Sequence, residues 1–459
     1  MQYYRLSGDG KKIGAFGPQG LSIVNAASGQ SFAKRVPTDR MVGHINPRNE
    51  WRQIFHDCWR VQRDFFYVEN MHGVDWDEVR ERYGAMIDDC VTRRDLSFIL
   101  GEIIAELNIG HAYYGGGDQE GQPFDETVGL LGCDFKLVDT EDGLAYQISK
   151  IYEGAPWDAD ARNPLRAMGV DVKEGDFLLE INGTALDTDL DPWASFIGLA
   201  GQVTELTVSE KAIVDDDARR VLIEPLRGDR GLRYRDWIEA NRKYVEEKSG
   251  GRIGYICVPD TGVRGQTDLV RQFFGQRHMD GLIIDERWNG GGQIPTRFIE
   301  LLNRPATSMW ANRHGHDQKW PPDAHFGPKA MLINGQAGSG GDMFPFLFKQ
   351  AGLGPLIGTR TWGGLVGISG NPMPIDRAFM SVPRFGHYDL DGTWGIEGHG
   401  VDPDIEVIDD PALMVDGGDP QLDKAIQVVL DAIEEYVSPF PPRPTDPDRS
   451  GMGIREEDK

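Results

Sequence analysis

The strongest candidate nucleophile in this sequence is Ser339, which lies between glycines in the segment AGSGGD at 337–342. An apolar run ends shortly before it at Asn334 and a helical pattern begins near Gly341, so the segment predicts a tight turn that exposes the hydroxyl. The helix N-terminus supplies free N–H groups, and that of Gly340 would face the oxyanion formed when Ser339 attacks a carbonyl. The same pattern is also typical of a turn residue or a helix cap.

A second glycine-rich turn is placed to supply the other oxyanion donor. The run GLIID at 281–285 predicts a buried strand, and NGGG at 289–292 follows it. Strand ends of a parallel sheet gather functional groups at one edge, so we expect the N–H group of Gly292, or of Gly291, to lie near Ser339.

A serine nucleophile requires a base and a group that orients the base. His111 is the best placed of the ten histidines, because it follows a strongly patterned helix and precedes the glycines at 115–117. Glu397, between glycines in WGIEGHGVDPD, is the candidate carboxylate. A structural or surface role remains open for both residues, and three other histidines are alternatives for the base: His314, His316 and His399.

The sequence predicts neither a metal site nor a cofactor. His314 and His316 lie close together, but no HExxH pattern or matched carboxylate accompanies them. No charged segment followed by an apolar run opens the chain, which favours a reducing, cytoplasmic compartment. The cysteines are widely spaced without a CxxC pair, so we expect buried thiols rather than a zinc knuckle or a disulfide framework at Cys58, Cys90, Cys133 and Cys257.

Strands and helices that alternate along residues 230–437 would position these groups. This pattern predicts an α/β catalytic domain with a buried, largely parallel sheet. We expect a first helix at 234–248, continuous apolar strands at 254–258, 281–285 and 329–334, and helices that begin at Asp268 and Pro295.

Residues 38–123 predict a helical subdomain that carries the candidate base. Apolar residues recur at helical spacing over 51–59, and a second helix is expected at 76–87. Thr92 and Asp95 offer a capping pair at the start of a third helix over 92–107.

The remaining segments read as β structure and a tail. Residues 1–37 resemble a β-propeller blade remnant, with an ordinary edge hairpin as the alternative. At 124–229, the stretches GLLGCDF and EGDFLLEINGTAL resemble a PDZ domain, whose glycine-rich loop captures a peptide carboxylate; a structural spacer is the alternative. Residues 438–459 are Pro-rich and predict disorder. The fold class expected is therefore multidomain, with helical, β and α/β parts.

Composition excludes several classes of partner. Acidic residues number 73 against 48 basic ones, a formal charge of −25, which repels nucleic acid backbones and anionic lipid surfaces. No stretch approaches the roughly 20 consecutive apolar residues that a membrane helix needs. We expect neither nucleic acid nor membrane as a partner.

The order of these motifs resembles the catalytic half of the tricorn core protease family. A helical segment ending in His, a PDZ-like module and an α/β domain with NGGG, AGSGGD, GTRTWGG and GVDPD cover about 50–430. The resemblance implies a tail-protease or crotonase-like catalytic fold that trims oligopeptides released by a larger protease, as a cytoplasmic homohexamer without metal or cofactor. It also implies roles for five residues: Ser339 as nucleophile, His111 as base, Glu397 as acidic member, and Gly292 and Gly340 as oxyanion donors.

The related C-terminal processing peptidases resemble the chain less closely. They pair the serine with a lysine in a TFGKG-like segment, and Gly364 stands at that position here. Lys349 follows Ser339 by ten residues on an expected helix and should point elsewhere. The resemblance to the histidine-based mechanism is therefore the stronger one.

The chain departs from the family pattern in three places. Gly110 replaces the family serine that bridges the histidine to the glutamate, so either water or a direct contact from Glu397 must replace the bridge, or activity is weakened. The acidic residue behind the family's preference for basic side chains aligns near Met309 or Trp310, so we expect apolar or uncharged residues to be preferred. The family's propellers are missing apart from residues 1–37. A peptide-binding scaffold with a weakened or inactive site is the alternative function, and we expect extended peptide to pair near 362–368.

Overall fold

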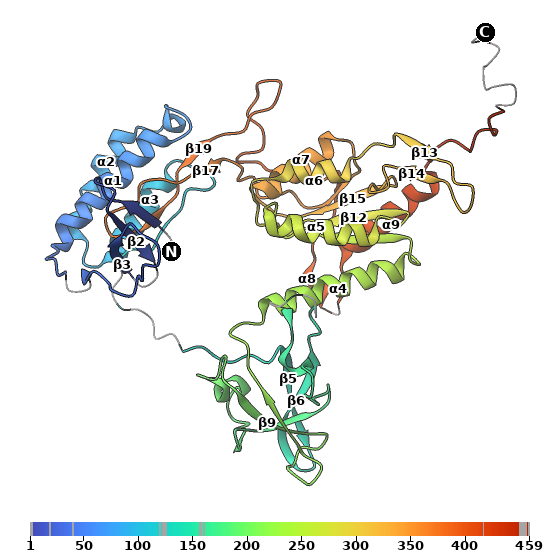
Figure 1. The fold of residues 1–459 in the computed structure, drawn as a ribbon, viewed down its shortest axis with the longest axis horizontal. Coiled ribbons are helices and arrows are strands. Elements are labelled where there is room, and N and C mark those ends of the chain that lie inside the picture. Colours follow the sequence, from blue (N-terminus) through green and yellow to red (C-terminus); the bar gives the residue numbers. More distant parts are fainter. Residues whose placement is uncertain are drawn as a thin grey trace.

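The computed structural model describes residues 3–17, 20–38, 41–118, 121, 126–155, 158, 161–415, 417–448 and 457. Figure 1 shows a helical body and a parallel-sheet body side by side, with an antiparallel β body below the latter. No helix in the described part of the chain combines the length and apolar character needed to cross a membrane.

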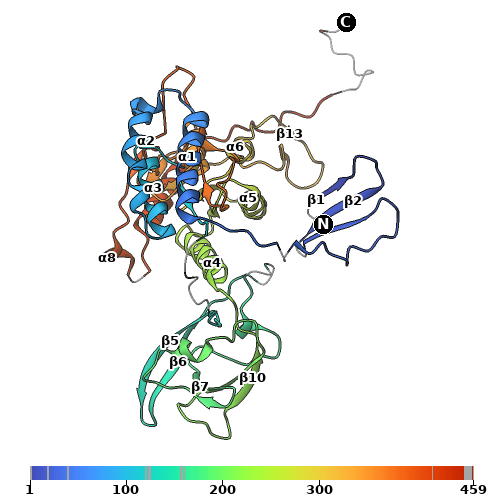
Figure 2. The same cartoon turned by 90° about the vertical axis from the view of Figure 1, so that its left-hand side faces the viewer.

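The chain begins with a small antiparallel sheet that stands apart from the helices in Figure 2. Its strands are β1 (Tyr3–Leu6), β2 (Lys12–Gly17) and β3 (Gly20–Asn25), in that order. Both Tyr3 and Tyr4 are more than half exposed.

The helical body contains α1 (Pro47–Phe65), α2 (Trp76–Gly84) and α3 (Arg93–Ala105), with short 3-10 turns at Met71–Gly73 and Ile87–Asp89. The helix predicted to run to residue 87 ends earlier, at Gly84. At the start of α3 the expected capping box forms. The side chain of Thr92 accepts from the backbone N–H of Asp95, and the side chain of Asp95 accepts from the backbone N–H of Thr92.

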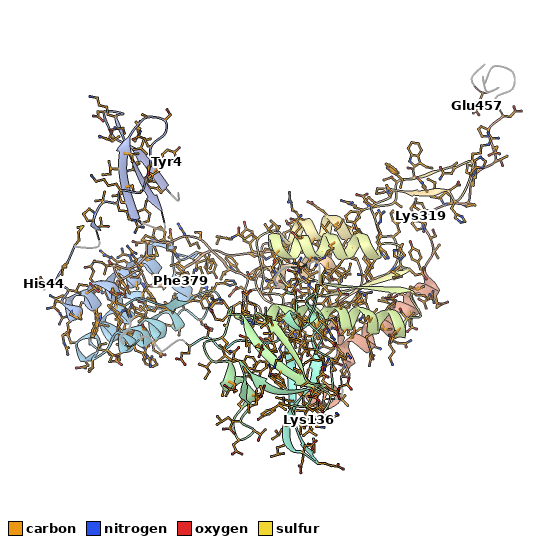
Figure 3. All side chains as sticks on the ribbon, turned by 60° about the horizontal axis from the view of Figure 1, so that its bottom comes forward. Tyr4, His44, Lys136, Lys319, Phe379 and Glu457 are labelled. Carbon is orange, nitrogen blue, oxygen red and sulfur yellow. The ribbon has the colours of Figure 1, made fainter. Side chains whose placement is uncertain are left out.

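A segment of the C-terminal body, residues 376–385, crosses into this helical body and is called the crossing segment below. Strand β18 (Phe379–Met380) pairs with β4 (Tyr114–Gly115), and β19 (Pro383–Phe385) pairs with β17 (Gly367–Ile368). Figure 3 places Phe379 where the two bodies meet. The next residue, Met380, packs into the helical core.

The antiparallel body is a sheet in the order β10-β9-β7-β6-β5, with β8 beside β7. Its outer strand β10, from the run RRVLI, was not among the predicted strands. The elements are β5 (Cys133–Thr140), β6 (Gly143–Ile151), β7 (Phe177–Ile181), β8 (Thr184–Ala185), β9 (Thr204–Ser209), β10 (Arg219–Ile223) and two 3-10 turns, Pro164–Arg166 and Pro192–Phe196.

The C-terminal body is built on a parallel sheet in the order β11-β12-β15-β16-β20. Every residue of its first three strands is buried, as the continuous apolar runs predict. The strands are β11 (Ile253–Cys257), β12 (Gly281–Asp285), β15 (Lys329–Ile333), β16 (Leu356–Gly358) and β20 (Ile405–Glu406).

Helices cover both faces of this sheet, so the predicted fold class is confirmed. One face packs against α4 (Arg230–Lys248) and α9 (Pro420–Glu435). The other packs against α5 (Val263–Gln276), α6 (Pro295–Leu302) and α7 (Gly340–Gln350). A hairpin of β13 (Ser308–Trp310) and β14 (Gln318–Trp320) and the short helix α8 (Pro411–Met414) complete the body.

Two predicted helix starts are wrong, and the first helix of this body begins at Arg230 rather than at residue 234. The helix expected to begin at Asp268 begins at Val263, because the side chain of Asp260 accepts from the N–H groups of Gly262 and Gly265, each at 2.9 Å. Asp268 is instead buried inside the helix beside Arg235.

Within the described part of the Pro-rich tail, residues 438–448 have no regular secondary structure and contact the hairpin region. Phe440 packs on Phe326 and Arg443 donates to the carbonyl of Asn312 at 2.9 Å. Most of the later tail lies outside the described residues.

Candidate active site

The turn before α7 places Ser339 at the N-cap of the helix with a partly exposed side chain. Its φ of 62° and ψ of −118° lie in a region that L-residues rarely adopt, which costs on the order of 1–3 kcal/mol and needs support from the surroundings. Part of that support is a hydrogen bond of 2.7 Å from Ser339 N to Asp342 Oδ2. The backbone is therefore held in place at the residue that would act as nucleophile.

Asp342 ties this turn to the neighbouring loop and was not singled out by sequence reasoning. Its fully buried carboxylate also accepts from the Thr361 hydroxyl at 2.6 Å and from Gly363 N and Gly364 N at 2.7 and 3.1 Å. Burial raises the pKa of Asp342, and these hydrogen bonds act against that shift. An acid three residues after the nucleophile, in the first turn of a helix, is the signal that points to this role.

Two backbone amides beside Ser339 form a candidate oxyanion hole. A Cβ atom on Gly291 would lie 2.6 Å from Ser339 Cβ, and one on Gly340 would lie 2.8 Å from Gly292 N, so these turns need glycine. Gly291 N donates to Asn289 Oδ1 at 2.9 Å, which leaves Gly292 as the donor of this turn. Among the described residues, neither Gly292 N nor Gly340 N has an acceptor.

His111 lies at the end of the helical body, in the loop that joins α3 to β4. Its φ is 59°, and its carbonyl accepts from the hydroxyl of Ser381, which belongs to the crossing segment. Burial lowers the pKa of His111, while the negative charge of Glu397 acts in the opposite direction. A neutral imidazole at neutral pH is the form that a general base requires.

Glu397 is held by backbone amides from two loops. Its Oε1 accepts from Gly110 N at 2.9 Å, and its Oε2 accepts from Leu365 N and Val366 N at 2.6 and 2.8 Å. The carboxylate therefore joins the histidine loop to the loop after Thr361. Among the described residues it makes no hydrogen bond to the His111 ring, whose buried Nδ1 has no partner there.

The candidate groups lie on separate loops, which Glu397 and Asp342 tie to the loop of residues 361–366. Among the described residues, no hydrogen bond joins Ser339 Oγ to His111. Catalytic hydrogen bonds of this kind often tighten only when substrate binds.

Gly110 is required by the close approach of three loops. A Cβ atom there would lie 2.9 Å from Gly364 Cα and 3.0 Å from Glu397 Oε1. We expect Gly110→Ala to push Glu397 away from the amides it accepts from, and to lower kcat/KM about tenfold or more, since small displacements of catalytic groups are costly. Steady-state kinetics on a peptide substrate would test this. Gly101→Ala, at an open position in α3, is the control, and equal activities of parent and Gly110→Ala would contradict the expectation.

A second buried carboxyl, Glu286, lies directly after β12. It is fully buried, and neither of its oxygens has a partner among the described residues. Burial, followed by the negative charges of Asp342 and Asp285, raises the pKa of Glu286 well above its ordinary value of 4.5. The native state therefore holds a proton that the unfolded chain releases.

This proton makes the stability depend on pH. The raised pKa of Glu286 adds to the free energy of unfolding in full below about pH 4.5. This contribution is lost as the pH rises through the folded-state pKa. Glu286→Gln, of similar shape and always neutral, should raise the melting temperature relative to the parent at pH 7–9 and lose that advantage near pH 4. Calorimetry across this range would show it, with exposed Glu224→Gln as control; parallel pH curves for parent and Glu286→Gln would contradict it.

The alternative catalytic residues have other partners. Lys349 Nζ forms an ion pair with Asp404 Oδ1 at 2.6 Å, and His399 Nε2 lies 2.8 Å from Asp402 Oδ2. His314 and His316 lie in the exposed loop between β13 and β14. In the residues that the structure describes, no group of His, Cys, Asp or Glu side chains is arranged to hold a metal ion.

Two expectations about peptide docking need revision. The N–H groups of residues 362–366 already donate to Ala337 O, Asp342 and Glu397, so this loop cannot offer them to an extended peptide. In the PDZ-like loop, Gly129 N and Leu130 N donate to backbone carbonyls at 2.9 Å, and fewer donors remain for a peptide carboxylate than the sequence predicts.

Comparisons with known proteins identify the domains along the chain. Family models match in chain order: the tricorn protease C1 domain at residues 47–105, the tricorn protease PDZ domain at 129–228, and peptidase family S41 at 252–407.

Curated relatives extend over nearly the whole chain. It is 37% identical over 449 residues to tricorn protease homolog 1 of Streptomyces coelicolor, covering 96% of this chain and 41% of the relative. It is 33% identical over 442 residues to the tricorn protease of Thermoplasma acidophilum, covering 96% and 40%. The crystal structure of the tricorn protease superposes with a TM-score of 0.86 at 32% identity, covering 95% of this chain and 42% of that one. The chain thus spans less than half the length of these relatives.

Proposed function

Because the chain belongs to the tricorn protease family, of which it carries the C1 helical, PDZ and S41 peptidase domains, we propose that it is a serine peptidase that cleaves oligopeptides through an acyl-enzyme. The observation that carries this proposal is the turn at Ser339, where a strained nucleophile position lies beside the unpartnered amides of Gly292 and Gly340. A purely structural turn does not require two amides that have no acceptor among the described residues beside a partly exposed hydroxyl.

In the first half of the reaction, His111 takes the proton of the Ser339 hydroxyl as the oxygen attacks the scissile carbonyl carbon. The carbonyl electrons move to the oxygen, and the N–H groups of Gly292 and Gly340 donate to this oxyanion. When the carbon–nitrogen bond breaks, the imidazolium gives its proton to the leaving amine, and the acyl group stays on Ser339.

In the second half, water replaces the amine and the same groups act again. His111 takes a proton from the water, whose oxygen attacks the ester carbon. Collapse of the oxyanion breaks the bond to Ser339 Oγ, which takes the proton back. The oxygens of Glu397 accept from backbone amides and not from the His111 ring. In this cycle Glu397 therefore stabilises the imidazolium through its negative charge.

We propose further that the substrates are oligopeptides released by a larger protease, and that the chain acts as a cytoplasmic homohexamer, as the family resemblance implies. Cleavage after apolar or uncharged residues fits the side chains of Met309 and Trp310 in β13, where the family's acidic residue aligns. Faster cleavage after Lys or Arg in a peptide library would overturn this preference.

A fluorophosphonate probe tests the proposed function directly. We expect it to label the purified chain at Ser339, located by peptide mass spectrometry, and a mixed oligopeptide library to be cut in the same preparation. Peptide binding without labelling or cleavage would favour the scaffold alternative. Loss of labelling in Lys349→Ala but not in His111→Ala would favour the serine and lysine mechanism instead.

A further inference from the structure

The base in this site lacks the hydrogen bond that normally orients a catalytic histidine. His111 Nδ1 is buried and has no acceptor among the described residues. Both oxygens of Glu397 are occupied by backbone amides, including that of Gly110. Among the described residues, ring packing is therefore the contact that can orient the imidazole.

An indole ring lies against the imidazole. The rings of Trp362 and His111 have centroids 5.5 Å apart at an interplanar angle of 48°, and the ring of Tyr113 lies 6.1 Å from His111 at 56°. Aromatic pairs at these separations are attractive and favour defined ring orientations.

The same indole also contacts the loops that carry the base and the nucleophile. A Cβ atom on Gly338, which precedes Ser339, would lie 2.5 Å from Trp362 Cε3, and one on Gly110 would lie 3.6 Å from its Cη2. One side chain thus touches the turn before Ser339, the residue before His111 and the imidazole itself.

The backbone around Trp362 is fixed firmly enough to hold this position. Trp362 N donates to Ala337 O at 2.8 Å, in the turn before the nucleophile. The residues on either side, Thr361 and Gly363, both donate to the buried carboxylate of Asp342. Yet 46% of Trp362 is exposed, so burial in a core does not explain a tryptophan at this place.

We propose that Trp362 is a positioning residue, whose indole holds the imidazole of His111 in the orientation that takes the proton of Ser339 and shields the ring from water. This inference rests on the proposed function, and it assigns to aromatic packing what a hydrogen bond to Nδ1 would otherwise do. Trp362 itself exchanges no proton and forms no bond with the substrate.

The test compares Trp362→Leu and Trp362→Phe with the parent by steady-state kinetics across pH. We expect Trp362→Leu to lower kcat roughly 10- to 100-fold with little change in KM, and Trp362→Phe to retain most of the activity because it keeps an aromatic face. Trp193→Leu is the matched control, since it removes a partly buried aromatic partner of Phe135 in the antiparallel body.

The pH profile separates positioning from a general loss of structure. The titratable groups facing His111 are Glu397 and Tyr113, and neither changes in these variants. Because burial lowers the pKa of His111, opening the ring to water in Trp362→Leu should raise it, and the acid limb of kcat/KM should move to higher pH. Trp362→Phe should show a smaller shift in the same direction.

Histidine titration by NMR provides a readout that does not depend on activity. The His111 resonance is identified by its absence in His111→Gln, and its pKa should rise in Trp362→Leu, or in Trp362→Phe if the leucine variant does not fold. An unchanged His111 pKa, unchanged kcat, or a change confined to KM would overturn the positioning role. Absence of probe labelling in the parent would instead overturn the proposed function, and the NMR result would still decide where the indole lies.

Discussion

Ser339→Ala should lower peptide turnover by about 10⁴-fold or more while leaving the fold intact. The hydroxyl is the only group in the proposed cycle that forms a covalent bond with the substrate. Its removal leaves the oxyanion amides and the peptide contacts, which explains why some rate above the uncatalysed reaction should remain. Thermal melting should stay close to that of the parent, because alanine at φ 62° is as strained as serine and the side chain is only partly buried.

His111→Ala should lower peptide turnover by a similar factor. The double variant Ser339→Ala with His111→Ala should be no slower than the slower single variant, because the two groups act as a unit. Mass-spectrometric analysis of peptide products, with Ser339-directed labelling in parallel, measures both. His399→Ala is the control, since its exposed ring pairs with Asp402 outside the site. Turnover by Ser339→Ala within tenfold of the parent would rule out the acyl-enzyme mechanism.

The second large effect is expected at the contact between the two bodies. Arg93 of α3 donates to Asp376 Oδ2 from Nε at 2.8 Å and from Nη2 at 2.7 Å, and both side chains are almost fully buried. Asp376→Ala removes the buried carboxylate that pairs with this guanidinium, which should lower the free energy of unfolding by about 3–5 kcal/mol.

Activity should fall together with stability. Asp376 opens the crossing segment, which pairs with β4 and whose Ser381 accepts from Tyr113 N and donates to the His111 carbonyl. Loosening this segment moves the base relative to Ser339, so we expect loss of probe labelling at temperatures where the parallel-sheet body remains folded.

Chemical denaturation and labelling at a series of temperatures measure these two effects. Asp88→Ala, which breaks an exposed ion pair with Arg52 in the same helical body, should change stability by less than about 1 kcal/mol. The double replacement Arg93→Met with Asp376→Leu should cost less than Asp376→Ala, because it leaves no unpaired charge. A loss below 1 kcal/mol for Asp376→Ala would contradict the expectation.

Local patterns in the sequence were enough to place most elements. The capping pair before α3, the continuous apolar strands of the parallel sheet and the glycine-rich turns at their ends each depend on neighbours within a few residues, and all appear in the structure. The start of α5 was missed, because Asp260 rather than Asp268 holds its first turn. Strand β10 was missed because its run RRVLI is short and charged at one end.

The candidate site residues differ in how far the sequence indicates them. Ser339, Gly340, Gly292, His111 and Glu397 were all proposed from residue type and local setting, and the family resemblance implied their roles. Asp342 was overlooked although it belongs to the AGSGGD motif, since its four partners come from two separate loops. Trp362 shows no local signal at all, because its contacts with His111 and Gly338 join segments far apart in the chain.

The sequence by itself determined the element types, the candidate nucleophile and the family, because helical periodicity, buried strands and glycine turns are set by short-range sterics and apolar spacing. Only the tertiary structure decided how the base is held. The crossing segment carries β18 into the helical body, the amides of three residues donate to both oxygens of Glu397, and the indole of Trp362 lies against the imidazole of His111. These contacts join residues separated by up to 287 positions in the chain, so local spacing in the sequence cannot predict them.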